Sequence, residues 1–78
     1  MYFAKDEIIE LNDEKKYLIS DNALIDEITY YKVKEVNNEQ KELIGEFKYI
    51  SAENIEGKLF ITEITDAQIL AKLEELLN

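Results

Sequence analysis

Two tyrosines and two lysines lie together in the stretch ITYYKVKEV, residues 28–36. On a β-strand, aromatic rings can stack on the bases of single-stranded nucleic acid while lysines meet the phosphates. Because side chains alternate along a strand, Tyr30, Lys32 and Lys34 share one face of this segment. Tyr31 lies on the other face. The nucleic-acid hypothesis therefore requires Tyr30 to be exposed beside the two lysines.

The charge of the chain argues against that hypothesis. Nine lysines oppose eighteen acidic residues, which gives a net charge of −9, and there is no arginine. Such a protein repels nucleic acid and anionic membranes and favours basic partners. Most affinity for phosphates comes from a wide basic groove, and the sequence does not show the basic residues that would form one. We therefore expect no direct nucleic-acid binding, with Tyr31 and Val33 in the core and Tyr30 partly exposed on the opposite face.

The residue types for covalent catalysis do not occur together. A nucleophilic serine needs an adjacent base, most often histidine, and Ser20 and Ser51 belong to a chain without histidine. Paired carboxylates can hydrolyse glycosides, but that reaction needs a sugar-sized cleft between them. A chain of 78 residues has little room for such a cleft. We expect no catalytic residue, and hence a protein that is not an enzyme.

Metal and cofactor sites are also not expected. Zinc is held mainly by cysteine and histidine, and the chain has neither. Four oxygen-bearing side chains lie close together in sequence: Asp21, Asn22, Asp26 and Glu27. Their spacing matches no calcium-binding loop. The isolated glycines cannot cradle a phosphate, so we interpret Gly57 as a hairpin turn residue and Gly45 as a strand start or bulge.

Length and composition indicate one small domain, residues 1–78. That size is near the lower end of what folds unaided, and 46% apolar residues is far from the disordered class. The opening MYFAKDEIIEL reaches Asp6 and Glu7 before any apolar run of the length that a signal peptide needs. No segment has the length of a membrane span. We therefore expect a cytoplasmic protein that has no contact with membranes.

Five runs of residues that favour strands lie between polar clusters at 12–15, 20–22, 37–40 and 53–57. These runs are EIIEL (7–11), KYLIS (16–20), ITYYKVKEV (28–36), EFKYIS (46–51) and KLFITEI (58–64). Connections this short fit antiparallel hairpins. Two interpretations of ALIDE (23–27) stay open: it extends the second strand through a bulge, or it forms the turn into the third.

The end of the chain changes to a helical period. One stripe contains Ile69, Leu70, Leu73, Leu76 and Leu77. Thr65 and Gln68 have the spacing of a capping box, and Asp66 suits the positive end of a helix dipole. We predict a helix from about Asp66 to Leu77. Its polar face is acidic, which disfavours a membrane surface, so we expect it to cover one face of the sheet.

The predicted fold class is α+β: an antiparallel sheet of four to five strands, Ile8 to Ile64, with one C-terminal helix packed on it. The candidate core residues are Ile9, Leu11, Leu18, Tyr31, Val33, Phe47, Tyr49, Leu59, Ile61, Ile69, Leu70, Leu73 and Leu77. Both faces of 58–64 are apolar, so the face that the helix covers stays open. A second subunit could cover the other face and bury some of Phe60, Ile64 or Ile50, so a homodimer is expected.

The tracts KYLISDNALIDEITYYKVKEV, GEFKYIS and KLFITEITDAQILAKLEELL resemble a family of small acidic bacterial proteins of unknown function. The similarity lies in a central strand of the pattern Y-x-V, here Tyr31 to Val33, a following hairpin, and I-x-D, here Ile64 to Asp66, before a C-terminal helix. It spans residues 16–77. A glycine that the family tends to carry between its second and third strands is missing here. The resemblance implies an α+β fold and a bacterial or phage setting, and it implies no activity.

Two functional classes follow from these observations. The first is a non-catalytic protein-interaction module, an adaptor or inhibitor, that binds a protein partner through its acidic or apolar surface. The alternative is an acidic mimic of nucleic-acid charge that occupies a DNA- or RNA-binding protein. A mimic needs carboxylates arrayed along one face, whereas scattered charge beside an apolar patch favours the module.

Overall fold

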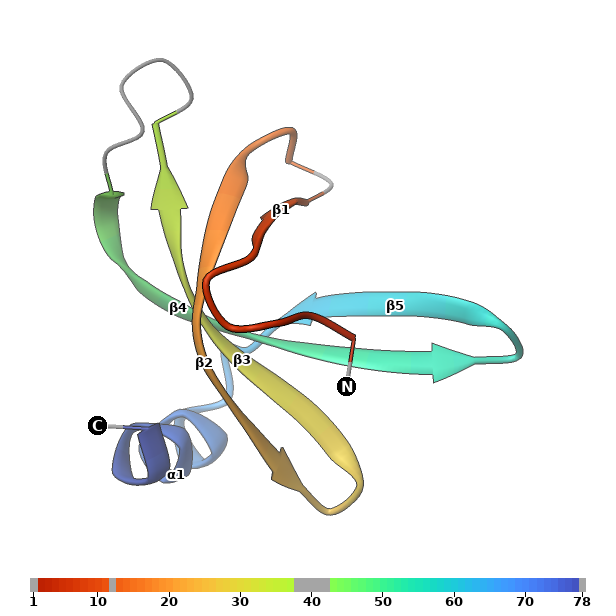
Figure 1. The fold of residues 1–78 in the computed structure, drawn as a ribbon. Coiled ribbons are helices and arrows are strands. Elements are labelled where there is room, and N and C mark those ends of the chain that lie inside the picture. The colour runs from red at the N-terminus through yellow and green to blue at the C-terminus, as the bar shows by residue number, and fades with distance from the viewer. Residues whose placement is uncertain (1, 12, 38–42, 78) are drawn as a thin grey trace.

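A five-stranded antiparallel sheet and one helix make up the fold (Figure 1). The computed structural model describes residues 2–11, 13–37 and 43–77. The elements are β1 (Ile8–Glu10), β2 (Lys16–Ile25), β3 (Ile28–Val36), β4 (Leu43–Ile55), β5 (Lys58–Glu63) and α1 (Ala67–Leu77). The strands lie in sequence order, and each pairs with its neighbour in antiparallel orientation. The predicted α+β class is confirmed, with five strands.

The β4–β5 hairpin has a tighter turn than the sequence predicts. The turn between β4 and β5 is Glu56–Gly57 alone, because β4 continues to Ile55, which pairs with Lys58. Both turn residues have positive φ, 53° and 84°, as two-residue hairpins of the primed type require. This confirms Gly57 as a turn residue, whereas the prediction that the whole cluster 53–57 is a turn is wrong. The predicted polar connection at 37–40 lies mostly outside the described residues.

A bulge at Ser20 moves the apolar residues of β2 from one face of the sheet to the other: Tyr17 and Ile19 lie on one face, and Ala23 and Ile25 on the opposite face. Ile19 pairs with Val33, and the next paired residue, Asp21, is opposite Lys32, so Ser20 is an extra residue in the ladder. One extra residue shifts the alternation of all that follow it. Residues 23–25 therefore extend the second strand through a bulge, and the turn is Asp26–Glu27, whose φ angles are 50° and 70°. The polar cluster 20–22 lies inside β2 and not between strands.

A second bulge separates β3 from the first part of β4. Val33 pairs with Lys48, but two residues further along β3, Glu35 pairs with Ile44. Gly45 lies in this longer piece of β4 with φ at 75°, a conformation that costs a residue with a Cβ atom more than it costs glycine. The prediction that Gly45 belongs to a strand start or bulge is confirmed.

One face of the curled sheet is filled by an apolar cluster that the N-terminal segment covers. Its buried members are Ile9, Tyr17, Ile19, Tyr31, Val33, Ile50 and Ala52, with Phe3, Leu11 and Ile61 packed against them. The ring of Phe3 meets that of Tyr31 edge-on, with the centroids 5.2 Å apart. The Tyr31 hydroxyl accepts hydrogen bonds from the backbone N–H groups of Tyr2 and Phe3, at 2.9 and 3.0 Å. The chain itself thus supplies part of the second cover that the apolar sheet requires.

Helix α1 covers the opposite face and buries a second cluster. Tyr30, Tyr49 and Leu73 are buried there, and the half-buried residues packed against them are Ala23, Ile25, Ile28, Ile64, Ile69, Leu70 and Leu77. Ile64 packs in this cluster, so the helix covers the face of the sheet that contains Ile64. Leu59 and Ile61 point to the opposite face. The expectation that Tyr30 is partly exposed is wrong, because its side of β3 lies beneath the helix and leaves it only 6% exposed.

The helix begins with a different cap from the predicted one. The Asp66 Oδ1 atom accepts hydrogen bonds from the backbone N–H groups of Gln68, at 2.8 Å, and Ile69, at 3.3 Å. The Asp66 carbonyl accepts the first helical bond, from the Leu70 N–H. Asp66 is therefore the N-cap residue. The capping box of Thr65 with Gln68 is wrong, since the residue three positions after the true cap is the apolar Ile69.

Most of the predicted core residues are buried or half-buried. Ile9, Tyr31, Val33, Tyr49 and Leu73 are buried, and Leu11, Leu18, Ile61, Ile69, Leu70 and Leu77 are half-buried. Phe47 and Leu59 are exposed, at 44% and 42%, so their assignment to the core is wrong. Phe47 lies next to the second bulge, and Leu59 lies on the β4–β5 hairpin, which extends away from the helix (Figure 1). In the described part of the chain, no helix is long and apolar enough to cross a membrane.

Candidate partner-binding groove

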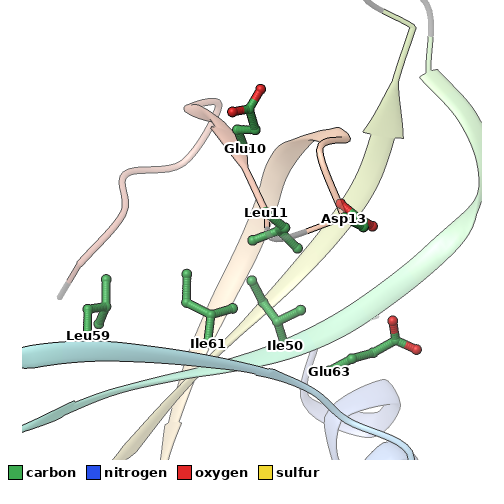
Figure 2. A pocket seen from close by; sticks show the side chains of 7 residues that line it. All are labelled: Glu10, Leu11, Asp13, Ile50, Leu59, Ile61 and Glu63. Carbon is green, nitrogen blue, oxygen red and sulfur yellow. The ribbon is translucent and has the colours of Figure 1, made fainter.

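The curl of the sheet brings both of its edges to one groove. The edge strands are β1 and β5, and residues next to both line a cavity of about 230 Å³ (Figure 2). We call it the acidic groove. Its lining residues are Glu10, Leu11, Asp13, Ile50, Leu59, Ile61 and Glu63. The curled sheet thus leaves a gap between its first and last strands, and the groove lies in this gap.

The floor of the acidic groove is aliphatic. Figure 2 shows Ile50, Leu59 and Ile61 side by side, with Leu11 opposite them. Leu59 and Ile61 share a face of β5 because they are two residues apart, and Ile50 lies across from Glu63 on the neighbouring strand. Leu59 is exposed and Ile61 only half-buried, so this apolar surface is in contact with water. An apolar segment that filled the groove would remove that surface from water.

Asp13 forms the acidic rim on the side of β1. Its Oδ2 atom accepts a hydrogen bond from the Tyr17 hydroxyl at 2.7 Å, and its Oδ1 atom accepts one from the Lys15 backbone N–H at 2.9 Å. The Tyr17 bond, followed by the Lys15 bond, lowers the pKa of the Asp13 carboxyl. Burial, and then the bond to Asp13, raises the pKa of the Tyr17 phenol. Asp13 is therefore held both in position and in its charged form.

Glu63 forms the rim on the side of β5. Its carboxylate lies 3.5 Å from the Nζ atom of Lys48, which is 5.7 Å from the centre of the Tyr17 ring. Partial burial acts to lower the pKa of Lys48, but the Glu63 carboxylate and the Tyr17 phenol together outweigh this effect, so the pKa of Lys48 is raised. Both partners are well exposed, so the pair adds little stability. The series Asp13, Tyr17, Lys48 and Glu63 links the two sides of the groove.

A second hollow, of about 240 Å³, lies between the β2–β3 hairpin and the helix. Its lining residues are Ile25, Asp26, Tyr30, Gln68, Ile69 and Lys72. It contains one acid and one base, whereas all charged residues that line the acidic groove are carboxylates. Of these two hollows, the acidic groove is the one that favours one sign of charge in a ligand.

The structure separates the oxygen-bearing residues that the sequence places close together. Asp21 and Asn22 lie on β2, opposite Lys32 and Tyr31, while Asp26 and Glu27 form the hairpin turn. Among residues 2–11, 13–37 and 43–77, no three acidic side chains gather closely enough to hold a metal ion.

The lysines of ITYYKVKEV surround an aromatic ring of the neighbouring strand. The Nζ atoms of Lys32 and Lys34 lie 4.3 and 4.8 Å from the centre of the Phe47 ring, close enough for cation–π attraction. Tyr30, which base stacking would require at the surface, is buried beneath the helix. The aromatic residue beside these lysines is therefore Phe47, and a sequence pattern within one strand could not indicate it.

We expect no measurable binding of fluorescent single-stranded DNA or RNA at physiological salt. The acidic charge of the whole chain opposes binding. Phe47 is the exposed ring that lies within cation–π distance of the two lysines, whereas Tyr30 and Tyr49 on the neighbouring positions are buried. Fluorescence anisotropy would measure this. Tight binding that is lost in the Lys32→Ala, Lys34→Ala double variant would contradict the expectation, and the matched control is Lys58→Ala with Lys72→Ala.

Comparison with family models, curated proteins and solved structures finds no match. The resemblance to small acidic bacterial proteins stays a prediction from residues 16–77. The acidic groove itself was not predicted from the sequence. One signal pointed to it: Leu59, Ile61 and Glu63 alternate along one strand, which places an acid beside two aliphatic side chains.

Proposed function

We propose that this chain is a non-catalytic protein-interaction module, an adaptor or inhibitor, that binds a basic and partly apolar segment of a partner protein in the acidic groove. The observation that carries the proposal is an aliphatic floor, in contact with water, beneath a rim of carboxylates. A bacterial or phage cytoplasm is its expected setting, from composition and resemblance.

The chemistry of the groove supports a cationic occupant. Apolar side chains of a partner would pack on the floor residues Leu59 and Ile61, and the burial of this apolar surface provides affinity. The rim adds Glu10, whose side chain makes no hydrogen bond or ion pair with a described residue. Contacts between these carboxylates and a lysine or arginine of the partner would mainly increase the specificity and the rate of association. The net charge of −9 attracts such a partner from a distance.

The distribution of charge favours this module over mimicry of nucleic acid. Carboxylates occur on each described element: Glu10, Asp21, Glu35, Glu46, Glu53, Glu63, Glu74 and Glu75. Glu53 and Glu63 lie on opposite faces of the β4–β5 hairpin, since Glu53 pairs with Phe60 and Glu63 with Ile50. Lysines lie among them. A mimic needs one continuous acidic ridge, and charge on both faces does not favour one.

Selection from a library of random linear peptides tests the proposal. The protein is the bait, and the Leu59→Ser, Glu10→Gln, Glu63→Gln variant removes peptides that bind elsewhere. All three side chains are exposed, so this variant should fold. We expect enriched peptides to combine lysine or arginine with aliphatic residues, and to bind the wild type at least tenfold more tightly than the variant, a difference of about 1.4 kcal/mol.

The control variant carries matched changes away from the groove: Leu24→Ser, Glu53→Gln and Glu56→Gln. It should bind the selected peptides like the wild type. The proposal is wrong if no peptide is enriched, or if the enriched peptides bind the groove variant and the control variant equally.

The face of β5 opposite the groove provides a separate expectation, self-association. Of the three residues expected to remain uncovered, Ile50 is buried and Ile64 packs under the helix, but Phe60 is 49% exposed. Ile55 is equally exposed on the same face, diagonal to Phe60. A dimer through this patch must overcome the repulsion of two chains at −9, which salt screens.

Sedimentation equilibrium should show a self-association that strengthens with salt. It should weaken in the Phe60→Ser variant but not in the control variant Leu24→Ser. A monomer at both low and high salt would rule out the dimer.

A further inference from the structure

We propose that the partner segment binds as an extended strand, antiparallel to β5, on the free edge of that strand, and so fills the gap between β5 and β1. This inference rests on the proposed function and specifies how the acidic groove is filled. An added strand gains main-chain hydrogen bonds from the edge and specificity from the side chains it places on the sheet.

Strand β5 is an unprotected edge. Natural proteins blunt their edges with short strands, bulges, proline or charge. The other edge, β1, has only three residues. By contrast, β5 has six, its pairing with β4 runs from Ile50 with Glu63 to Ile55 with Lys58 without a bulge, and its charged residues are confined to its two ends. The four residues between them are uncharged.

The direction of the backbone groups of β5 follows from one hydrogen bond. The Ile64 N–H donates to the Tyr49 carbonyl at 2.8 Å, so Ile64 directs its backbone toward β4. In an antiparallel ladder the hydrogen-bonded pairs alternate along the strand. Phe60 and Thr62 therefore also bond to β4. The N–H and C=O groups of the residues between them point to the free edge; these residues are Leu59, Ile61 and Glu63.

These three residues are also those whose side chains line the acidic groove. An antiparallel partner residue directly opposite Leu59, Ile61 or Glu63 exchanges hydrogen bonds with it and places its side chain on the same face. The preferred partner residues are therefore apolar opposite Leu59 and Ile61, and basic opposite Glu63. From its N-terminus the partner segment has the pattern basic, any, apolar, any, apolar. Antiparallel pairing matches the rest of the sheet and is slightly more stable per residue than parallel pairing.

Charge selects a foreign segment over a second copy of this chain. Two β5 strands paired about Ile61 would place Glu63 of each copy opposite Leu59 of the other, so that each carboxylate faces an apolar residue at the floor of a groove. Two chains at −9 also repel each other. A basic strand meets neither obstacle.

The probe is a capped synthetic peptide, Lys-Thr-Ile-Thr-Val, with a second basic residue added at each end for solubility. N-methylation of its Ile and Val residues removes N–H groups that face β5, and should weaken binding roughly tenfold or more. N-methylation of the two Thr residues, whose N–H groups face away from β5, should have an effect of less than about threefold. The reversed sequence has the same composition and should bind more weakly than the original.

Amide hydrogen exchange by NMR provides a second measurement. Peptide binding should slow exchange at Leu59, Ile61 and Glu63, and leave Phe60 and Thr62, already bonded to β4, little changed. If the peptide binds with neither effect, strand addition is wrong while the proposed function stands. If groove-selected peptides do not exist, the proposed function itself fails. Protection of the three amides that rises with protein concentration, without peptide, would mean that a second copy occupies the edge and would overturn the proposal.

Discussion

The Leu73→Ala variant should lose about 2–4 kcal/mol of the free energy of unfolding, as measured by urea denaturation. Leu73 is the one fully buried side chain of the described helix, with 0% exposure, and it packs with Tyr30 and Tyr49. Truncation removes its apolar contacts and leaves a cavity between the helix and the sheet. A small domain has roughly 5 kcal/mol of stability in total, so the variant should be close to unfolded at room temperature.

The matched control for this variant is Leu76→Ala. Leu76 lies on the same helix and in the same predicted stripe, but its side chain is 56% exposed. The same chemical change there should cost less than about 1 kcal/mol. A loss below about 1 kcal/mol in Leu73→Ala, or an equal loss in both variants, would contradict the packing of α1 on the face that contains Tyr30.

The elements that repeat a single period were predictable from the sequence. Strand β3 occupies 28–36 as expected, because its residues favour β structure throughout and nothing interrupts them. The helix is equally clear, since its aliphatic stripe, from Ile69 to Leu77, follows one face for about two and a half turns. Both periods are local properties, and the fold class follows from their order.

The face to which each side chain of the sheet points was harder to predict, because a bulge changes it. The cluster SDN at 20–22 suits a turn by composition, but in the structure it contains one extra residue of a continuous strand. Only the partner strand shows this, since Ser20 is identified by the pairs on either side of it. Regular alternation from Tyr17 and Ile19 would not place Ala23 and Ile25 on the helix side. Tyr30, which pairs with Ala23, lies on the predicted face, but the helix buries it there.

The acidic groove depends on the same long-range effects. Its two sides are about fifty residues apart in sequence, at Leu11 and Ile61, and they meet because the sheet curls. Bulges increase the local twist and bend of a strand, and two of them lie in the ladders on either side of β3. Alternation within 58–64 could indicate an amphipathic strand, but not the residues of β1 that complete the groove.

Deletion of Ser20 should therefore remove the bulge and keep the fold, with a loss of less than about 2 kcal/mol in the free energy of unfolding, as measured by urea denaturation. Without the extra residue, the ladder between β2 and β3 becomes regular: Ile19 still pairs with Val33 and Asp21 with Lys32, and paired residues share a face of the sheet. Ala23 and Ile25 would stay in the cluster under the helix, and Asp21 would stay on the face opposite the one that contains Tyr31 and Val33. The deletion removes only the extra local twist and bend that the bulge gives β2.

The Ser20→Ala variant separates the bulge from the side chain of Ser20. It keeps the extra residue and changes only a half-buried hydroxyl, so its denaturation midpoint should correspond to a loss of less than about 1 kcal/mol. Far-ultraviolet circular dichroism should show native signal in both Ser20→Ala and the deletion variant. If instead the deletion variant is largely unfolded while Ser20→Ala is native, the expectation is wrong, and the local twist at the bulge is needed to hold the curled sheet together.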